Sequence, residues 1–383
     1  MLALALTFAV GCSSDEQAEG AMTEDAAGLI SQPYDVAIVH ANRANSTGDL
    51  SQVNGIIREV VANEGYLVAV LADGKPQAIT GTFTLQESNS RRREAEIQSN
   101  LDDVAKIDWS ATAPEVDLFN AIRLANNQLG VGGRSDVDNL LIVIDSGIST
   151  AGPINFTDDD TRYGLLDPQH LTEQLIDNGD LVEFENIDKV LWFGLGEACD
   201  PQESPNDGVK QLMENMYRAV FEAGGVVLPE NNGEIFRPGN NTLPSGDLPE
   251  VTVVEMPRVS SHEDGSLVKL GDKLEFDENS SSLKFDYDSS QFADAGAANA
   301  ELEQYTNQLV DFPDLHVTIK GYTDVNGDEN YNLGLSEKRA NAVRDMMVAG
   351  GVAPDQITVV GMGESADYET DEENRRVEIV FGE

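Results

Sequence analysis

Two patterns of apolar residues divide the chain. In the first part, short apolar runs alternate with longer segments in which apolar residues recur every three to four positions. The runs predict strands at 36–39, 66–71, 140–144 and 190–195, and the longer segments predict helices at 50–62, 91–107, 115–129, 168–176 and 209–223. Because strands that alternate with helices form parallel sheets covered on both faces, residues 33–229 are predicted to form a doubly wound, mainly parallel α/β domain.

The second pattern follows a stretch, residues 230–263, that is rich in Asn, Gly, Pro and Ser. This composition predicts an interdomain linker, with one short strand at 251–254. Beyond it, residues 264–383 predict strands at 283–288, 315–320, 357–360 and 377–380 and helices at 295–310 and 331–347. The order β-α-β-α-β-β predicts a separate α+β domain with a mixed sheet.

One basic residue lies in the middle of an apolar helix face. With about 100° per residue, Arg339 sits at the centre of a stripe that extends about 60° to each side. The stripe contains Leu335, Ala342, Val343 and Met346. A guanidinium on a buried face is unfavourable unless an anion meets it. Asp324, at the end of the preceding strand, is the nearest candidate in sequence, and Asn332 lies two turns before Arg339 on the same stripe.

Three motifs in this region carry a family resemblance. They are GYTDVNGDENYNLGLSEKRANAV at 321–343, GMGES at 361–365 and ENRRVEI at 373–379. Their order and spacing resemble the OmpA-like peptidoglycan-binding domain. The resemblance implies that Asp324 and Arg339 hold the free end of diaminopimelate in the peptide stem of peptidoglycan. It also implies that Asp288, Asn332, Arg375 and Arg376 line the same pocket.

The residue types suit this ligand. Diaminopimelate ends in an ammonium and a carboxylate on one carbon, so its receptor needs an anion and a cation close together. Aspartate accepts hydrogen bonds from an ammonium, and arginine offers a planar fork to a carboxylate. The alternative is that Asp324 and Arg339 form an ion pair that only stabilises the fold.

The first domain resembles the von Willebrand factor A fold, because a helix at 114–129 leads to the strand and turn at 141–147. That family holds a metal ion on a D-x-S-x-S turn after its first strand. Here the equivalent stretch, residues 40–46, reads HANRANS and departs at all three ligand positions. Asp145 is the one weak candidate for a metal ligand. We therefore expect no metal and no cofactor, and a degenerate domain that binds another protein or acts as a spacer between the two anchors.

Two other functions remain open for the first domain. It could be a metal-dependent adhesion module that the C-terminal domain moors to the cell wall. It could also be a hydrolase that uses Asp145 and Ser146, but no histidine is placed as a base, so we expect no enzymatic activity.

Charge narrows the possible partners. The chain of 383 residues has 69 acidic and 24 basic side chains, a net charge of −45. The acidic residues are spread over both predicted domains. Nucleic acids and anionic lipid headgroups are poor partners for such a surface.

The N-terminus predicts a membrane anchor. Residues 2–11 are apolar, too few to span a membrane, and end at Cys12. This arrangement resembles a bacterial lipoprotein cleavage site. It implies a signal peptide at 1–11, a lipidated Cys12, and a flexible spacer at 12–32. Cys199 is the only other cysteine, so acylation of Cys12 would leave it without a partner for a disulfide.

Together these patterns predict a lipid-anchored protein of the outer membrane that faces the periplasm. Its C-terminal domain would tether the membrane to peptidoglycan of the diaminopimelate type. Its N-terminal domain would meet another protein of the cell envelope.

Overall fold

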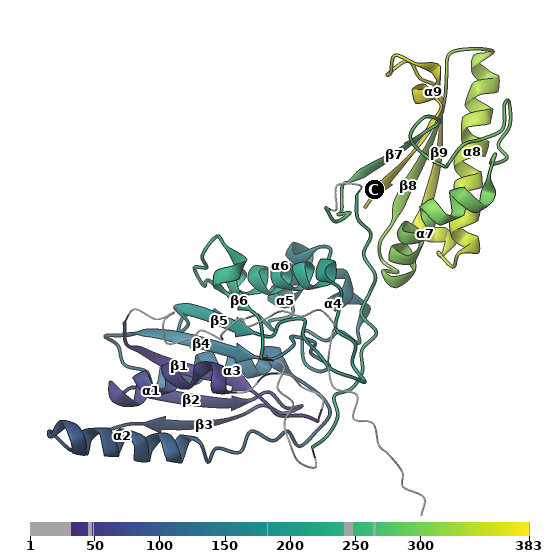
Figure 1. Cartoon of the computed structure of the whole chain (residues 1–383). Coiled ribbons are helices and arrows are strands. Elements are labelled where there is room, and N and C mark those ends of the chain that lie inside the picture. The colour runs from purple at the N-terminus through teal and green to yellow at the C-terminus, as the bar shows by residue number, and fades with distance from the viewer. Residues whose placement is uncertain are drawn as a thin grey trace, which may run out of the picture. The chain divides into compact units, whose positions relative to one another are not determined.

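The computed structural model describes residues 32–44, 48, 50–181, 183–240, 248–262 and 266–382. The described residues fall into two compact units (Figure 1). The first contains those up to Thr157 and those of Pro168–Glu255, and the second contains Asp158–Asp167 and those from Met256 onward. No helix within the described ranges has both the length and the apolar character needed to span a membrane.

The first unit contains a six-stranded sheet with the order β3-β2-β1-β4-β5-β6. The strands are β1 (Tyr34–His40), β2 (Tyr66–Leu71), β3 (Gln77–Thr82), β4 (Asp138–Ile144), β5 (Lys189–Phe193) and β6 (Phe236–Arg237). Neighbouring strands are parallel except for β2 and β3, which are antiparallel. The prediction of a mainly parallel α/β sheet is confirmed, and its four predicted strands are β1, β2, β4 and β5.

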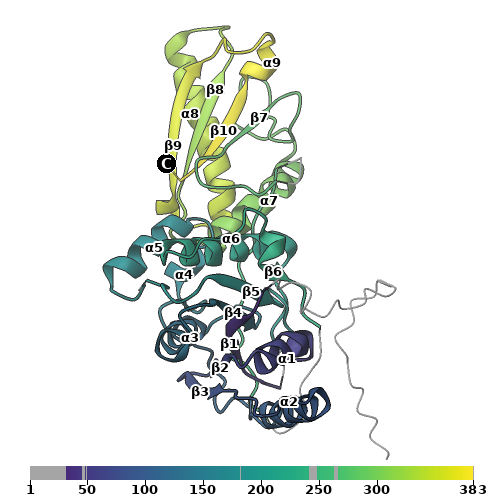
Figure 2. The ribbon, with the colours of Figure 1, turned by 90° about the vertical axis from the view of Figure 1, so that its left-hand side faces the viewer.

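Helices cover both faces of this sheet. The helices of the first unit are η2 (Leu50–Val53), α1 (Asn54–Ala62), α2 (Ser90–Val104), α3 (Leu118–Gly132), α5 (Pro168–Asp177), α6 (Asp207–Ala223) and η3 (Asn232–Glu234). Figure 2 shows α1 and α2 on one side of the sheet and α3 on the other. The five predicted helices correspond to η2 with α1, α2, α3, α5 and α6.

The predicted linker at 230–263 is wrong in part. Phe236 and Arg237 form the edge strand β6, which pairs with Trp192 and Phe193 of β5. Phe236 is buried, and its ring lies 6.1 Å from that of Trp192, so this apolar contact holds the strand to the sheet. The predicted strand at 251–254 is absent.

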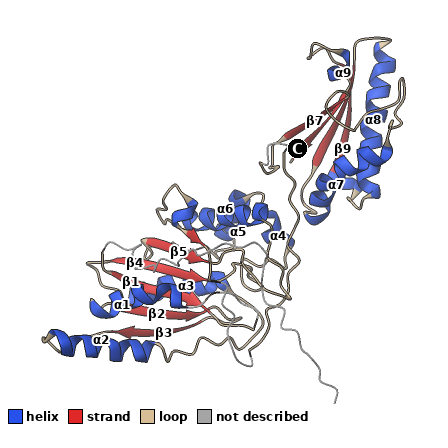
Figure 3. Ribbon diagram, in the orientation of Figure 1, coloured by secondary structure: helices blue, strands red, loops and turns tan. Residues whose placement is uncertain are grey.

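The second unit contains a four-stranded sheet with the order β7-β10-β8-β9. Its strands are β7 (Lys273–Asp277), β8 (Val317–Thr323), β9 (Ile357–Glu364) and β10 (Arg376–Phe381). Its helices are α4 (Asp159–Tyr163), α7 (Ala295–Asp311), α8 (Glu329–Ala349), η4 (Pro354–Gln356) and α9 (Asp371–Asn374). Only β8 and β9 are parallel, so the sheet is mixed, as predicted. Figure 3 shows α7 and α8 along one face of this sheet.

Two predicted strands of this unit need correction. Residues 283–288 form a loop, and β7 at Lys273–Asp277 is the first strand. The alternation at 283–288 arose because Leu283 is buried in the core and Phe285 stacks on Phe292, not because the segment joins the sheet. Strand β8 also continues past Gly321 to Thr323, since its pairing with β9 resumes after an irregularity at Gly321 and Tyr322.

Gly321 brings β8 close to α8. A Cβ atom at this position would lie 2.2 Å from the carbonyl oxygen of Ser336, in the middle of α8. Only glycine allows this approach without moving the helix. As a result, the end of β8, with Asp324, lies beside the buried face of α8 that carries Arg339.

Candidate functional site

A pocket of about 450 Å³ lies in the second unit, beside the end of β8 and the first turns of α8. Five of the six predicted peptidoglycan-binding residues line it: Asp288, Asp324, Asn332, Arg339 and Arg375. They come from the loop before α7, the loop after β8, the helix α8 and the residue before β10. The fold therefore brings together residues that are far apart in the sequence.

Arg339 is buried without an acidic partner. Its residue is 4% exposed, its Nε donates a hydrogen bond to the carbonyl oxygen of Ser289 at 3.0 Å, and its guanidinium lies 5.1 Å from the ring centre of Phe285. Among the described residues, no carboxylate oxygen lies within 4.0 Å of its nitrogens. Burial lowers the pKa of Arg339 from its ordinary value, and Glu278 is the strongest of the carboxylates that oppose this shift.

Asp324 pairs with Arg375 and not with Arg339. Its Oδ2 accepts from Nη1 of Arg375 at 2.5 Å, and its Oδ1 accepts from the backbone N–H of Asn326 at 2.8 Å. The alternative of a structural Asp324–Arg339 ion pair is therefore wrong. The reason is the register of the sheet: Val377 of β10 lies opposite Gly321 of β8, which brings the residue before β10 beside the end of β8.

Arg375 joins three acidic segments. Besides Asp324, it pairs with Glu278 after β7 at 2.7 Å and with Glu372 of α9 at 3.1 Å. Burial acts to lower the pKa of Arg375, but the hydrogen bonds that Arg375 donates to these carboxylates outweigh it and raise the pKa above its ordinary value. Arg375 thus fixes the position of Asp324.

Asp288 and Asn332 shape the pocket through neighbouring groups. Asp288 has a left-handed backbone with φ of 54°, and its Oδ1 accepts from the hydroxyl of Tyr331 at 2.7 Å. Strained backbone of this kind is often found at binding sites. Asn332 is 4% exposed and donates to the carbonyl of Asn326 at 3.1 Å and to Glu364 at 2.8 Å. It ties the loop after β8 to the end of β9.

The prediction that Arg376 lines the pocket is wrong. Alternation along β10 turns its side chain to the opposite face of the sheet from Val377. There its guanidinium donates to Glu378, Ser365 and Asp367, each at 2.9 Å. It also lies close to two rings, with its centre 3.8 Å from that of Tyr322 and 4.9 Å from that of Tyr368.

This cluster perturbs Tyr322. Its hydroxyl donates to Glu378 at 3.0 Å, and burial, followed by the charge of Glu378, raises the pKa of Tyr322 to about 12. Glu378 itself is 4% exposed and also faces Lys273 at 3.5 Å. Arg376 and Glu378 therefore form a buried, paired cluster on the sheet face away from the pocket.

Several pocket residues were missed from the sequence. They are Glu278, Phe285, Tyr287, Thr323, Asn326, Leu335 and Asp371. Glu278 was missed because it follows β7, which the apolar pattern did not reveal. Thr323 is 3% exposed, and its hydroxyl has no hydrogen-bond partner within the described part of the chain.

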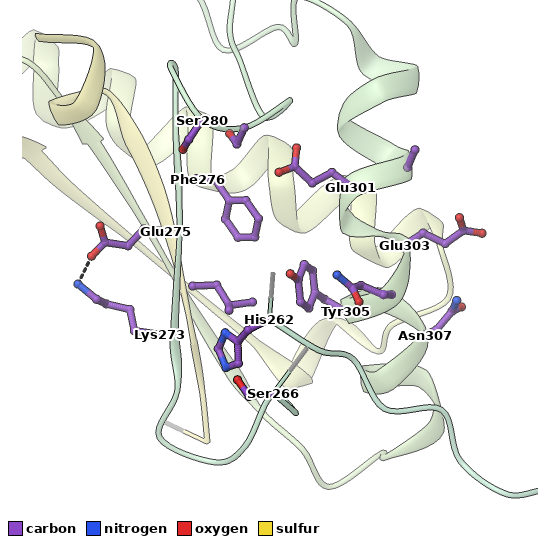
Figure 4. Close-up of a pocket in the computed structure, with 14 residues that line it drawn as sticks. His262, Ser266, Lys273, Glu275, Phe276, Ser280, Glu301, Glu303, Tyr305 and Asn307 are labelled. Carbon is purple, nitrogen blue, oxygen red and sulfur yellow. Dashed lines mark ion pairs between the residues drawn. The ribbon is translucent and has the colours of Figure 1, made fainter. Parts of the chain in front are cut away.

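A larger pocket of about 940 Å³ lies between β7 and α7 (Figure 4). Phe276 and Tyr305 point into it, whereas Lys273 and Glu275 point away and pair with each other. Its His262 pairs with Asp272 at 2.9 Å. None of the six predicted binding residues lines this pocket.

In the first unit, Asp145 is buried at the end of β4. It accepts from the backbone N–H of Gly147 at 2.8 Å, and burial raises its pKa although the charge of Arg43 opposes the shift. Arg43 is 1% exposed and donates to the carbonyls of Ala72 and Glu115 at 2.7 and 2.8 Å. No three His, Cys, Asp or Glu side chains of the described residues gather as metal ligands. Asn45 and Ser46 of the 40–46 stretch lie outside these residues.

The structure describes one of the two cysteines, Cys199. Cys199 is 5% exposed and disulfide-bonded, which contradicts the expectation, conditional on acylation of Cys12, that it forms no disulfide. Cys12, the predicted site of lipidation, lies outside the described residues, as do the predicted signal peptide and all of the predicted spacer except Gln32.

The pairing of Asp324 predicts how stability depends on pH. Burial acts to raise the pKa of Asp324, but the hydrogen bond from Arg375 outweighs it, and the net pKa is below the ordinary 3.8. A carboxyl with a lowered pKa stabilises the fold above 3.8, and this contribution is lost as the pH falls through the lowered value. We expect Asp324→Asn to be less stable than the parent at pH 7 in urea unfolding, with a difference that shrinks below pH 3.8. A difference that stays constant with pH would contradict the pairing.

The class of the second unit follows from a match to a known family. Residues 284–378 match the model of the OmpA family, so the C-terminal unit is an OmpA-like domain.

Known proteins are similar to this chain over part of its length. The peptidoglycan-binding protein ArfA of Mycobacterium tuberculosis is 46% identical over 85 residues, which are 21% of this chain and 26% of ArfA. The peptidoglycan-associated lipoprotein of Rhizobium meliloti is 31% identical over 121 residues, 30% of this chain and 62% of that protein. The solved structure of the peptidoglycan-associated lipoprotein of Burkholderia pseudomallei is 35% identical, covering 25% of this chain and 86% of that one, with a TM-score of 0.23. The chain thus spans about a quarter of the length of ArfA.

Proposed function

We propose that the C-terminal unit binds peptidoglycan without a covalent bond, through the free end of diaminopimelate. The observation that carries this proposal is the buried guanidinium of Arg339, which faces a pocket and has no carboxylate within 4.0 Å in the described structure. A buried cation of this kind needs an anion from elsewhere. The match to the OmpA family and the names of two relatives, the peptidoglycan-binding protein ArfA and the peptidoglycan-associated lipoprotein, support peptidoglycan as the ligand.

In this proposal each charged group of the ligand has a separate receptor. The ligand carboxylate meets Arg339, which offers free N–H donors, and the ligand ammonium meets Asp324. Arg375 and Asn332 keep Asp324 and its loop in place. Each charge-assisted hydrogen bond contributes roughly 1.5–3 kcal/mol, which suits a reversible tether present in many copies.

We further propose that the protein is anchored by lipid at Cys12 in the outer membrane and faces the periplasm. The first unit would then be a von Willebrand factor A-like domain that binds another envelope protein and catalyses no reaction. Its strand order supports a doubly wound fold, in which ligands bind at the carboxyl ends of the strands where the order reverses. That position is between β1 and β4, next to Asp145.

Binding to purified cell-wall sacculi tests the proposed ligand. We expect Asp324→Asn to reduce co-sedimentation of the full chain with sacculi by roughly tenfold or more, because the ammonium loses a charged acceptor. Asp345→Asn is the matched control, since Asp345 lies exposed on α8 and pairs with Arg344. The proposal fails if folded Asp324→Asn protein binds like the parent.

The lipid anchor has its own test. We expect the mature protein to carry lipid on Cys12 and to leave the membrane fraction when Cys12 is replaced by serine, since several acyl chains together hold a protein stably. The chain has two cysteines, Cys12 and Cys199. The sulfur of Cys12 can therefore carry a lipid thioether or form a disulfide with Cys199, but not both. Mass spectrometry of the N-terminal peptide decides between them. An unlipidated Cys12 in membrane-bound protein would contradict the anchor.

A further inference from the structure

The two arginines of the pocket differ in how many of their N–H donors are already paired within the protein. Arg375 makes ion pairs with Glu278, Asp324 and Glu372. Arg339 uses its Nε for the carbonyl of Ser289, and no described residue accepts from its terminal nitrogens. An arginine has five N–H donors, so four of them remain for a ligand.

The rest of the pocket repels a second anion. Four carboxylates, those of Glu278, Asp288, Asp324 and Asp371, line it against the two guanidinium groups. A ligand ammonium therefore finds several acceptors in the pocket. A ligand carboxylate finds free, charged donors only at Arg339 within the described lining.

From this asymmetry we infer that the pocket distinguishes the free carboxylate of diaminopimelate from its carboxamide, and so reads the amidation state of the peptide stem. The inference rests on the proposed function and makes its ligand more specific. A carboxamide is neutral, has a single acceptor oxygen, and turns N–H donors toward a guanidinium that has only donors. A stem with lysine at this position lacks the carboxyl group altogether.

The magnitude follows from the loss of a charge-assisted contact. Exchanging the carboxylate for a carboxamide should weaken binding by about 10- to 100-fold. The ammonium site at Asp324 is the same for both ligands. The ratio of the two affinities therefore reports on Arg339 alone, whereas the affinities themselves depend on the whole pocket.

Calorimetric titration of the full chain tests this inference with three soluble stem tripeptides. They carry diaminopimelate with a free ε-carboxylate, its ε-carboxamide, or lysine. We expect the free acid to bind most tightly and the other two about 10- to 100-fold more weakly. Equal binding of acid and amide would overturn the inference and leave peptidoglycan binding intact. Failure of all three to bind would overturn the proposed function, and the inference with it.

Variants distinguish the residue that contacts the ligand carboxylate, Arg339, from the residue that positions Asp324, Arg375. Arg339→Gln should bring the ratio of acid to amide affinity close to one, because the charge that reads the carboxylate is gone. Arg375→Gln should weaken both ligands alike and keep the ratio, because Arg375 acts through Asp324. Arg344→Gln is the matched control, because Arg344 is half-buried on α8, pairs with Asp345 and does not line the pocket. A ratio that survives Arg339→Gln, or that collapses with Arg375→Gln, would contradict this assignment. Should Arg339→Gln fail to fold, Arg339→Lys gives the same test, with a reduced ratio expected since the planar fork is lost.

Discussion

Arg339→Ala should abolish binding to sacculi while the fold keeps nearly all of its stability. Binding is lost because the ligand carboxylate has no other charged donor in the described lining of the pocket. Stability changes by only about 1–2 kcal/mol, because the variant loses one hydrogen bond and one cation–π contact but also removes a buried charge. The substitution removes no ion pair among the described residues, since no carboxylate oxygen lies within 4.0 Å of the Arg339 nitrogens.

Two measurements check this expectation. Co-sedimentation with sacculi reports binding, and urea unfolding of the same preparation reports the free energy of unfolding. Arg344→Ala is the control, because Arg344 lies on the same helix and pairs with its neighbour Asp345. A loss of about 3–5 kcal/mol together with retained binding would identify Arg339 as one half of a buried structural pair.

Arg376→Ala should have the opposite effect. The variant leaves Glu378, which is 4% exposed, without its main cation, and it removes the cation–π contacts with Tyr322 and Tyr368. Breaking a buried pair in this way costs about 3–5 kcal/mol. The folded fraction should still bind sacculi like the parent, because Arg376 does not line the pocket.

A second substitution sharpens this prediction. If the cost arises from the unpaired charge of Glu378, then adding Glu378→Gln to Arg376→Ala should restore part of the lost stability in urea unfolding. A single variant that is as stable as the parent, or one that folds but loses sacculus binding, would contradict the placement of Arg376.

Arg339 and Asp324 show which features of the site the local sequence pattern can predict. The helical period of α8 predicts a buried Arg339, and the structure confirms it at 4% exposure. The partner of Asp324 could not be predicted in this way. It depends on the pairing of β10 with β8, which joins Arg375 to a residue 51 positions away.

The sequence around Arg375 and Arg376 contains a period-two pattern that predicts which face of β10 each arginine occupies. Val377 and Ile379 alternate with Arg376 and Glu378 along β10, and both apolar residues are buried in the core. Arg375 is two residues before Val377, so it lies on the same side as the core residues, which is the side of the pocket. Arg376 lies on the opposite face with Glu378. Period-two alternation therefore separates the two arginines without any knowledge of the fold.

The sheets show a similar limit. Long apolar runs predict the central strands β1, β2, β4 and β5, because both of their faces are buried. Edge strands carry less apolar signal: β3 is mostly exposed, and β6 has only two residues. Glu278 was missed for the same reason, since it follows the edge strand β7.

The most direct test of the central claim follows the side chain of Arg339 itself. The Nε–Hε resonance of Arg339 in the ¹⁵N-labelled full chain is assigned by comparison with Arg339→Lys and monitored while the free-acid diaminopimelate tripeptide is added. We predict that this resonance shifts progressively and saturates with one tripeptide per chain, while that of Arg344 stays in place. Saturable binding of the tripeptide with no change at Arg339 would show that the buried guanidinium is not the receptor of the ligand carboxylate.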